Sequence, residues 1–143
     1  MIREYQNIFP VRIFIGTGIT AEEYKEFFEY DDVNVDDVIA MNCSVKVNAK
    51  KKSEFIYTSP NIKKSVLIII QEEDMFSMPV VMHEIIHNEV FTFKYIEHGI
   101  SDEDESMAYY AEYLMNCYLD FLGKVKKFPE KFKVLKDNLN LLK

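Results

Sequence analysis

The chain has 143 residues, of which 48% are hydrophobic and 29% are charged, and its net charge is -7 at pH 7. A chain of this length can form one domain with a substantial core, so we predict a single domain over residues 1–143, with 123–143 as a lysine-rich C-terminal extension. The acidic charge balance argues against a nucleic-acid partner, because phosphate contacts require a basic face. The two cysteines, Cys43 and Cys117, are too few to indicate a disulfide framework.

The sequence contains no apolar run long enough to cross a membrane, so we expect no membrane partner. Residues 1–5 include Arg3 and Glu4, and these charges interrupt the apolar core that a secretory signal would need. We therefore expect a cytoplasmic protein.

The N-terminal part predicts a strand followed by a short helix. Residues 11–15 alternate in the manner of a strand and lead into Gly16-Thr17-Gly18. Thr20 stands three residues before Glu23, which is the spacing of a capping box at a helix start. Residues 16–21 formally match a dinucleotide-binding fingerprint, but the helix is too short and the next strand does not end at an acidic residue, so we reject nucleotide binding.

The middle of the chain predicts three further strands. Residues 38–47 and 54–58 read as two strands of a hairpin around the lysines at 50–52, and 65–70 reads as a strand that is apolar on both faces. A strand that is apolar on both faces is typical of the interior of a sheet. Together with two later helices, these patterns predict an α+β fold with a small antiparallel or mixed sheet of about four strands.

Two helices follow the last of these strands. The first is expected to start near Ser77, with Pro79 in its first turn, and to end before Gly99. The second is expected to be capped by Ser101 and to carry apolar residues at helical spacing as far as Leu122. We expect the two helices to form a hairpin that covers the sheet.

The most informative motif is His83-Glu84-Ile85-Ile86-His87, which has the pattern H-E-x-x-H within the first of these helices. Two histidines four residues apart on a helix point in the same direction, so both imidazoles can bind one Zn²⁺ ion. Glu84 is then the candidate catalytic residue, acting as general base on the attacking water. The sequence therefore predicts a zinc hydrolase.

A catalytic zinc site needs a third protein ligand besides His83 and His87. Three candidates remain open from the residues alone: Glu105, His98 and Glu112. A long first helix would place Glu112 nearer the level of His87. An early end at Phe91-Thr92-Phe93, which is a poor helix-forming run, would instead bring Glu105 within reach.

Residues 65–122 resemble the gluzincin metallopeptidases in two features, the motif helix and a following helix that begins Asp104-Glu105-Ser106-Met107-Ala108-Tyr109. More narrowly, they resemble small uncharacterised peptidase-like proteins of tailed bacteriophages. The resemblance implies a zincin-like fold, Glu105 as the third metal ligand, and the host cytoplasm or a virion as the location. Asn88 departs from the small apolar residue expected after the second histidine.

The resemblance implies a metallopeptidase that hydrolyses peptide bonds of a protein or peptide substrate. The alternative is a structural virion component, such as a connector or ring protein, that uses a zinc-binding and inactive domain to contact neighbouring virion proteins. The sequence does not define the oligomeric state, and a homo-oligomer is compatible with either function. Candidates for an electrophilic helper are His98, Tyr109 and Tyr110.

Overall fold

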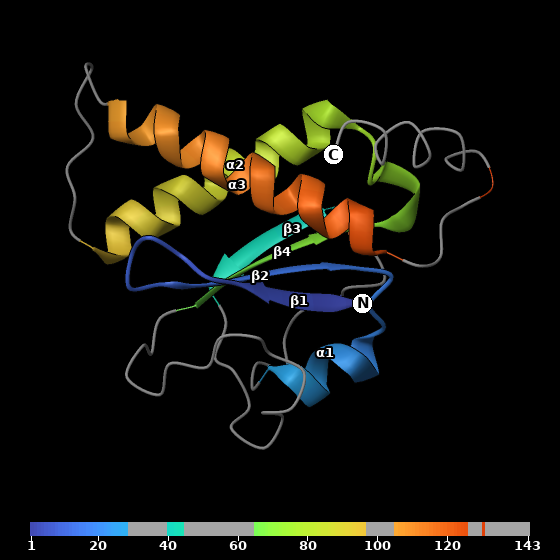
Figure 1. Cartoon of the computed structure of the whole chain (residues 1–143). Coiled ribbons are helices and arrows are strands. Elements are labelled where there is room, and N and C mark those ends of the chain that lie inside the picture. The colour runs from blue at the N-terminus through green and yellow to red at the C-terminus, as the bar shows by residue number, and fades with distance from the viewer. Residues whose placement is uncertain (29–39, 45–64, 97–104, 126–129, 131–143) are drawn as a thin grey trace.

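The computed structural model describes residues 1–28, 40–44, 65–96, 105–125 and 130 (Figure 1). The fold is α+β, as predicted, with a mixed sheet and three α-helices. In chain order the elements are β1 (Ile2–Tyr5), β2 (Arg12–Thr17), α1 (Ala21–Phe27), β3 (Ala40–Ser44), β4 (Ser65–Ile70), a 3-10 turn (Glu72–Asp74), α2 (Met78–Tyr95) and α3 (Glu105–Lys124).

The strands lie in the order β1-β2-β4-β3. β2 and β4 are parallel, with Arg12 opposite Ser65 and Thr17 opposite Ile70. β1 pairs with β2, and β3 with β4, in antiparallel fashion. The interior position predicted for 65–70 is confirmed, because β4 has a strand on each side and all six of its residues are buried.

The strands differ from the sequence prediction in two places. β1 was not predicted, because it has only four residues and two of them are charged. β3 is described only over Ala40–Ser44, and the predicted strand 54–58 and the lysine turn lie outside the described residues.

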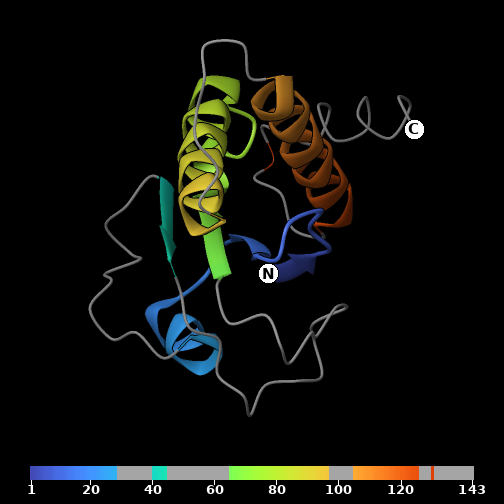
Figure 2. The same ribbon diagram turned by 90° about the vertical axis from the view of Figure 1, so that its left-hand side faces the viewer.

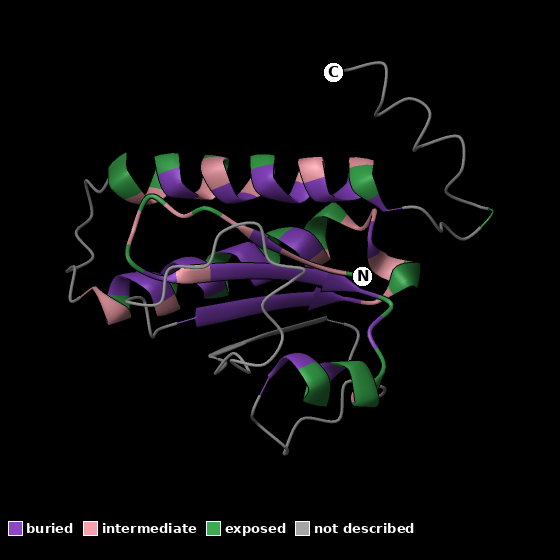
Figure 3. Cartoon of the chain, turned by 60° about the horizontal axis from the view of Figure 1, so that its bottom comes forward, coloured by how far each residue is buried: buried purple, intermediate pink, exposed green. Residues whose placement is uncertain are grey.

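The sheet separates two apolar cores. α2 and α3 cover one face and α1 lies on the other (Figures 1 and 2). The larger core contains Ile13, Ile15 and Ile68 of the sheet, and the smaller contains Phe14 and Leu67. Figure 3 shows that α3 alternates between buried and exposed residues along its length, as expected of a helix that lies on a sheet.

α2 and α3 lie over different strands of the same face. Figure 2 shows α2 above β4, with β3 beyond it, and α3 above β1. The hydroxyl of Tyr5 in β1 donates to Asp120 of α3 at 2.9 Å, and that of Tyr118 donates to the Met75 carbonyl at 2.7 Å. α3 is therefore fixed on the β1 side of α2.

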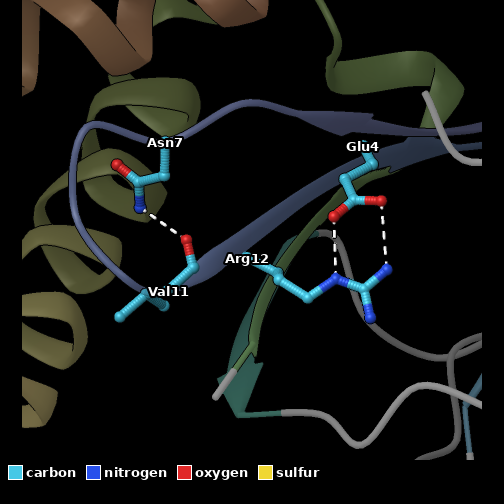
Figure 4. Close-up of polar contacts among 4 residues, drawn as sticks. All are labelled: Glu4, Asn7, Val11 and Arg12. Atoms are coloured by element: carbon cyan, nitrogen blue, oxygen red, sulfur yellow. Dashed lines mark hydrogen bonds and ion pairs between the residues drawn. The ribbon is translucent and has the colours of Figure 1, made fainter. Parts of the chain in front are cut away.

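The connection between β1 and β2 is held by polar contacts (Figure 4). Nδ2 of Asn7 donates to the Val11 carbonyl at 2.8 Å. On the neighbouring strands, the Arg12 guanidinium donates twice to the buried carboxylate of Glu4, at 2.7 and 3.0 Å. This paired geometry explains how a charged residue is accommodated in β1.

The capping box predicted for α1 is confirmed. The Glu23 amide donates to the Thr20 hydroxyl, and the Thr20 amide donates to the Glu23 carboxylate. The helix ends at Phe27.

α2 is unbroken from Met78 to Tyr95, so it does not end early at Phe91-Thr92-Phe93. Thr92 and Phe93 are fully buried, and their packing outweighs the low helix propensity of the run. Pro79 lies in the first turn, as predicted. Within the described ranges, no helix is long and apolar enough to span a membrane.

Candidate metal and catalytic site

His83 and His87 lie one turn apart on the exposed side of α2 and point toward each other. Their Nε2 atoms are 3.1 Å apart, and their rings meet edge to face with centroids separated by 4.7 Å. The predicted convergence of the two imidazoles is therefore present in the helix.

The spacing of these two nitrogens fits a shared zinc ion. Two nitrogen ligands at about 2.0–2.1 Å from one tetrahedral Zn²⁺ lie roughly 3.3 Å from each other, close to the 3.1 Å observed. Neutral imidazole is also a preferred zinc ligand. The histidine pair therefore supplies two of the donors that a zinc site requires.

Glu84 lies between the two histidines in sequence but is only 5% exposed. Burial raises the pKa of its carboxyl group, and the charges of His83 and His87 lower it to a smaller extent. A carboxylate with a raised pKa is a better proton acceptor near neutral pH than an ordinary surface glutamate. This environment suits Glu84 to the role of general base.

The structure does not bring a third ligand to the pair within its described part, where no group of three His, Cys, Asp or Glu side chains could hold a metal ion. Glu105 and Glu112 are both exposed on α3. His98 lies outside the described residues.

Helix geometry explains why neither Glu105 nor Glu112 lies beside the histidine pair. Glu89 of α2 faces α3, where the backbone of Ala111 contacts its carboxyl group. Successive residues turn by about 100° around a helix, so His87 lies roughly 160° around α2 from Glu89. α3 therefore packs on one flank of α2 and the histidines lie on the other.

The axial position of Glu105 along α3 also separates it from the histidine pair. Glu105 lies six residues before Ala111, so it is displaced by roughly 9 Å along α3 from the contact with Glu89. Because α2 and α3 run in opposite directions (Figure 1), this displacement carries Glu105 toward the Tyr95 end of α2 and away from His87. Glu105 as third ligand would require a different arrangement of the two helices, and it stays a prediction.

Asn88, which departs from the pattern of the gluzincin resemblance, has a structural role. It is fully buried, and its Oδ1 accepts hydrogen bonds from Thr92 at 3.3 Å and Tyr110 at 3.5 Å. The Tyr110 hydroxyl also accepts a hydrogen bond from Asn7 at 3.0 Å. These bonds connect α2, α3 and the β1–β2 connection.

The two tyrosines considered as electrophilic helpers occupy opposite environments. Tyr110 is fully buried in the hydrogen-bond network of Asn88, and burial raises the pKa of its phenol to about 12. It is therefore not accessible to a substrate. Tyr109 is 67% exposed on α3.

Sequence analysis missed the unusual state of Glu89. This residue is 4% exposed, its Oε1 has no hydrogen-bond partner in the described part of the chain, and burial raises its pKa to about 7. The helical period places Glu89 on a different side of α2 from the histidines. Its burial depends on the packing of α3, which the period does not show.

Comparison with protein-family models, curated proteins and solved structures gives no match for this chain.

Proposed function

We propose that the protein is a zinc-dependent metallopeptidase of the gluzincin-like class that hydrolyses peptide bonds of a protein or peptide. The observation that carries this proposal is the convergence of His83 and His87, whose Nε2 atoms are 3.1 Å apart, with the buried Glu84 next to His83 in the sequence. The packing of α2 and α3 on one face of a mixed sheet supports a zincin-like domain built around a helical hairpin.

In this proposal His83 and His87 would hold the metal through their imidazole nitrogens. A bound zinc ion would supply Lewis acidity, which lowers the pKa of water and polarises a carbonyl group. Glu84 accepts a proton from the attacking water and later donates it to the leaving amine. Burial raises the pKa of this carboxyl group, which makes its carboxylate a stronger proton acceptor.

The first experiment measures zinc content and peptidase activity in the wild type and two variants. We expect about one zinc ion per chain in the wild type and in Glu84→Gln, because the carboxylate is not a ligand in this reading. Hydrolysis of a peptide library should be lost in Glu84→Gln, since an amide cannot accept the proton. Glu26→Gln, on the exposed surface of α1, is the matched control and should keep activity.

Two results would count against the proposal. One is a wild-type protein that stays metal-free after zinc addition. The other is activity that survives in Glu84→Gln, which would remove that residue from the role of general base.

The third ligand is tested separately by zinc affinity in Glu105→Ala, Glu112→Ala and His98→Ala. The resemblance to gluzincins predicts the largest loss for Glu105→Ala, by about 10-fold or more. A loss confined to Glu112→Ala or His98→Ala would show that the predicted ligand is wrong without affecting the assignment of His83 and His87.

An alternative function is a structural virion component that uses the zinc-binding domain as a docking module. The observation that favours it is an exposed apolar row on α2, formed by Met82, Ile86 and Val90, at 37%, 51% and 43% exposure. These residues repeat every four positions and adjoin the histidines, so a neighbouring protein could cover both. A zinc-loaded wild type that cleaves no peptide, and whose self-association or partner binding is lost in Ile86→Asp, would favour this function.

A further inference from the structure

A second candidate site lies at the carboxyl ends of the parallel strands β2 and β4, away from the histidine pair. A cavity of about 720 Å³ opens there, lined by Met1, Arg3, Thr17, Gly18, Glu72, Lys124 and Val125. The side chains come from β1, the end of β2, the turn after β4 and the end of α3. Cavities of this size are typical of small-molecule sites.

Two residues that line this cavity each carry a buried polar atom with no hydrogen-bond partner inside the described part of the protein. Thr17 is 3% exposed, yet its hydroxyl makes no hydrogen bond there. Nε of Arg3 is also buried without a partner. An unsatisfied buried polar atom costs roughly 1–3 kcal/mol, so a ligand that offers these two atoms a hydrogen-bond partner would stabilise the folded chain.

Strand register explains why these groups converge. Arg3 is opposite Ile15 in the β1–β2 pair, and Thr17 is two residues beyond Ile15 on the same face. This face is the one covered by α2 and α3, so the end of α3 brings Lys124 to the same cavity.

The charges at the cavity define the chemistry of the ligand. Arg3 contributes a guanidinium group, whose planar set of donors matches a carboxylate or phosphate. Lys124 adds an ammonium group that is also paired with Asp120. Glu72 is the only acidic residue among the lining residues described, and its carboxylate can accept a hydrogen bond from an amine or hydroxyl.

Gly18 allows Glu72 to lie close to the strand end. Its φ angle is 57°, and a Cβ atom at this position would collide with Oε1 of Glu72. The absence of a side chain at Gly18 therefore lets the acidic group approach the end of β2, beside Thr17.

We propose that this cavity binds a small molecule that carries an oxyanion, either a carboxylate or a phosphate, together with an amine or hydroxyl group. The oxyanion contacts Arg3 and the Thr17 hydroxyl, and the second group contacts Glu72. The site shares no lining residue with the histidine motif, so it is independent of the proposed zinc chemistry.

The test is calorimetric titration with inorganic phosphate and, separately, with L-alanine, each combined with NMR of the backbone amides. Phosphate tests the phosphate arm of the proposal, and L-alanine tests the carboxylate arm with its adjacent ammonium group. We expect one of the two to bind with a Kd of roughly 1 mM or below and to shift the amide signals of Thr17 and Gly18.

Variants then assign the contacts. Arg3→Gln should weaken binding by about 10-fold or more, and Arg3→Lys should weaken it less because the charge is kept. Thr17→Val should weaken binding, yet leave the ligand-free protein as stable as the wild type or more so, since no hydrogen bond is lost. Lys25→Gln removes one exposed charge on α1 and should leave binding within about twofold, as expected of a distant surface site.

Three outcomes would overturn the proposal. The first is that neither probe binds at a concentration 10-fold above roughly 1 mM. The second is that binding has the same affinity in the wild type and in folded Arg3→Gln. The third is that the amides whose signals shift lie away from the cavity. None of these results bears on zinc content or peptidase activity.

Discussion

Individual polar residues buried on α2 have three different roles. Glu84 lies beside the histidine pair, Asn88 and Thr92 bond to Tyr110, and Glu89 faces α3. A buried carboxyl group is costly when it is charged and much less so when it is protonated. The effect of each glutamate on stability therefore depends on pH.

We predict that Glu89→Gln makes the metal-free protein more stable at pH 8 and less sensitive to pH. Burial raises the pKa of Glu89 from 4.5 to about 7, an effect that the Ala111 backbone partly offsets. The folded state therefore binds more protons than the unfolded state between these values, and stability falls as pH rises through this window. The amide does not ionise, so the gain at pH 8 should be roughly 1 to 3 kcal/mol.

Urea unfolding at pH 5 and pH 8 in the presence of a chelator measures this difference. Glu26→Gln, an exposed position on α1, should show the pH dependence of the wild type. An equal pH dependence in Glu89→Gln and the wild type would contradict the prediction.

At the scale of elements, local signals and packing contribute differently to each helix. α1 has only seven residues, and its reciprocal cap and its buried Tyr24 and Phe27 hold it on the sheet. α2 has 18 residues and continues through a run of poor helix formers because that run is buried.

For α1 we predict that Thr20→Ala lowers the free energy of unfolding by about 1 kcal/mol, the usual cost of losing such a cap. The variant loses the acceptor for the Glu23 amide, which lies 3.2 Å from the Thr20 hydroxyl. Thermal or chemical unfolding measures the change, with Thr20→Ser as the control that keeps the hydroxyl. Equal stability of Thr20→Ala and Thr20→Ser would show that the cap contributes nothing.

At the scale of the whole molecule, the mixed sheet carries α2 and α3 on one face and α1 on the other (Figure 2). The histidine pair and the cavity lined by Arg3 and Thr17 involve different residues around this sheet. A ligand that binds only the folded state stabilises the whole fold by mass action, whichever site it occupies.

We therefore predict that zinc raises the Tm of the wild type and that a chelator reverses the change. At a free zinc concentration about 100 times Kd, the stabilisation is about 2.7 kcal/mol, which corresponds to roughly 5–10 °C for a chain of this size. His83→Ala should lose most of the shift, because one imidazole alone binds zinc weakly. The same shift in the wild type and in His83→Ala, measured by calorimetry, would argue for zinc binding elsewhere.

Features set by neighbouring residues could be read from the sequence. The convergence of His83 and His87 follows from their spacing of four on a helix, and the α1 cap follows from the spacing of Thr20 and Glu23. The interior strand 65–70 was evident because an apolar run on both faces has to be covered on both. These signals depend on local backbone geometry and on composition.

Features that join distant segments depended on packing instead. β1 was not evident because its buried Glu4 is accommodated only by pairing with Arg12 of the neighbouring strand. The position of α3 on the Glu89 flank of α2 depends on how two helices pack. The cavity lined by Arg3, Thr17, Glu72 and Lys124 joins segments up to 121 residues apart. Periodicity shows which face of a helix is apolar, but the flank on which a neighbour packs is set by the combined fit of both helices and the sheet.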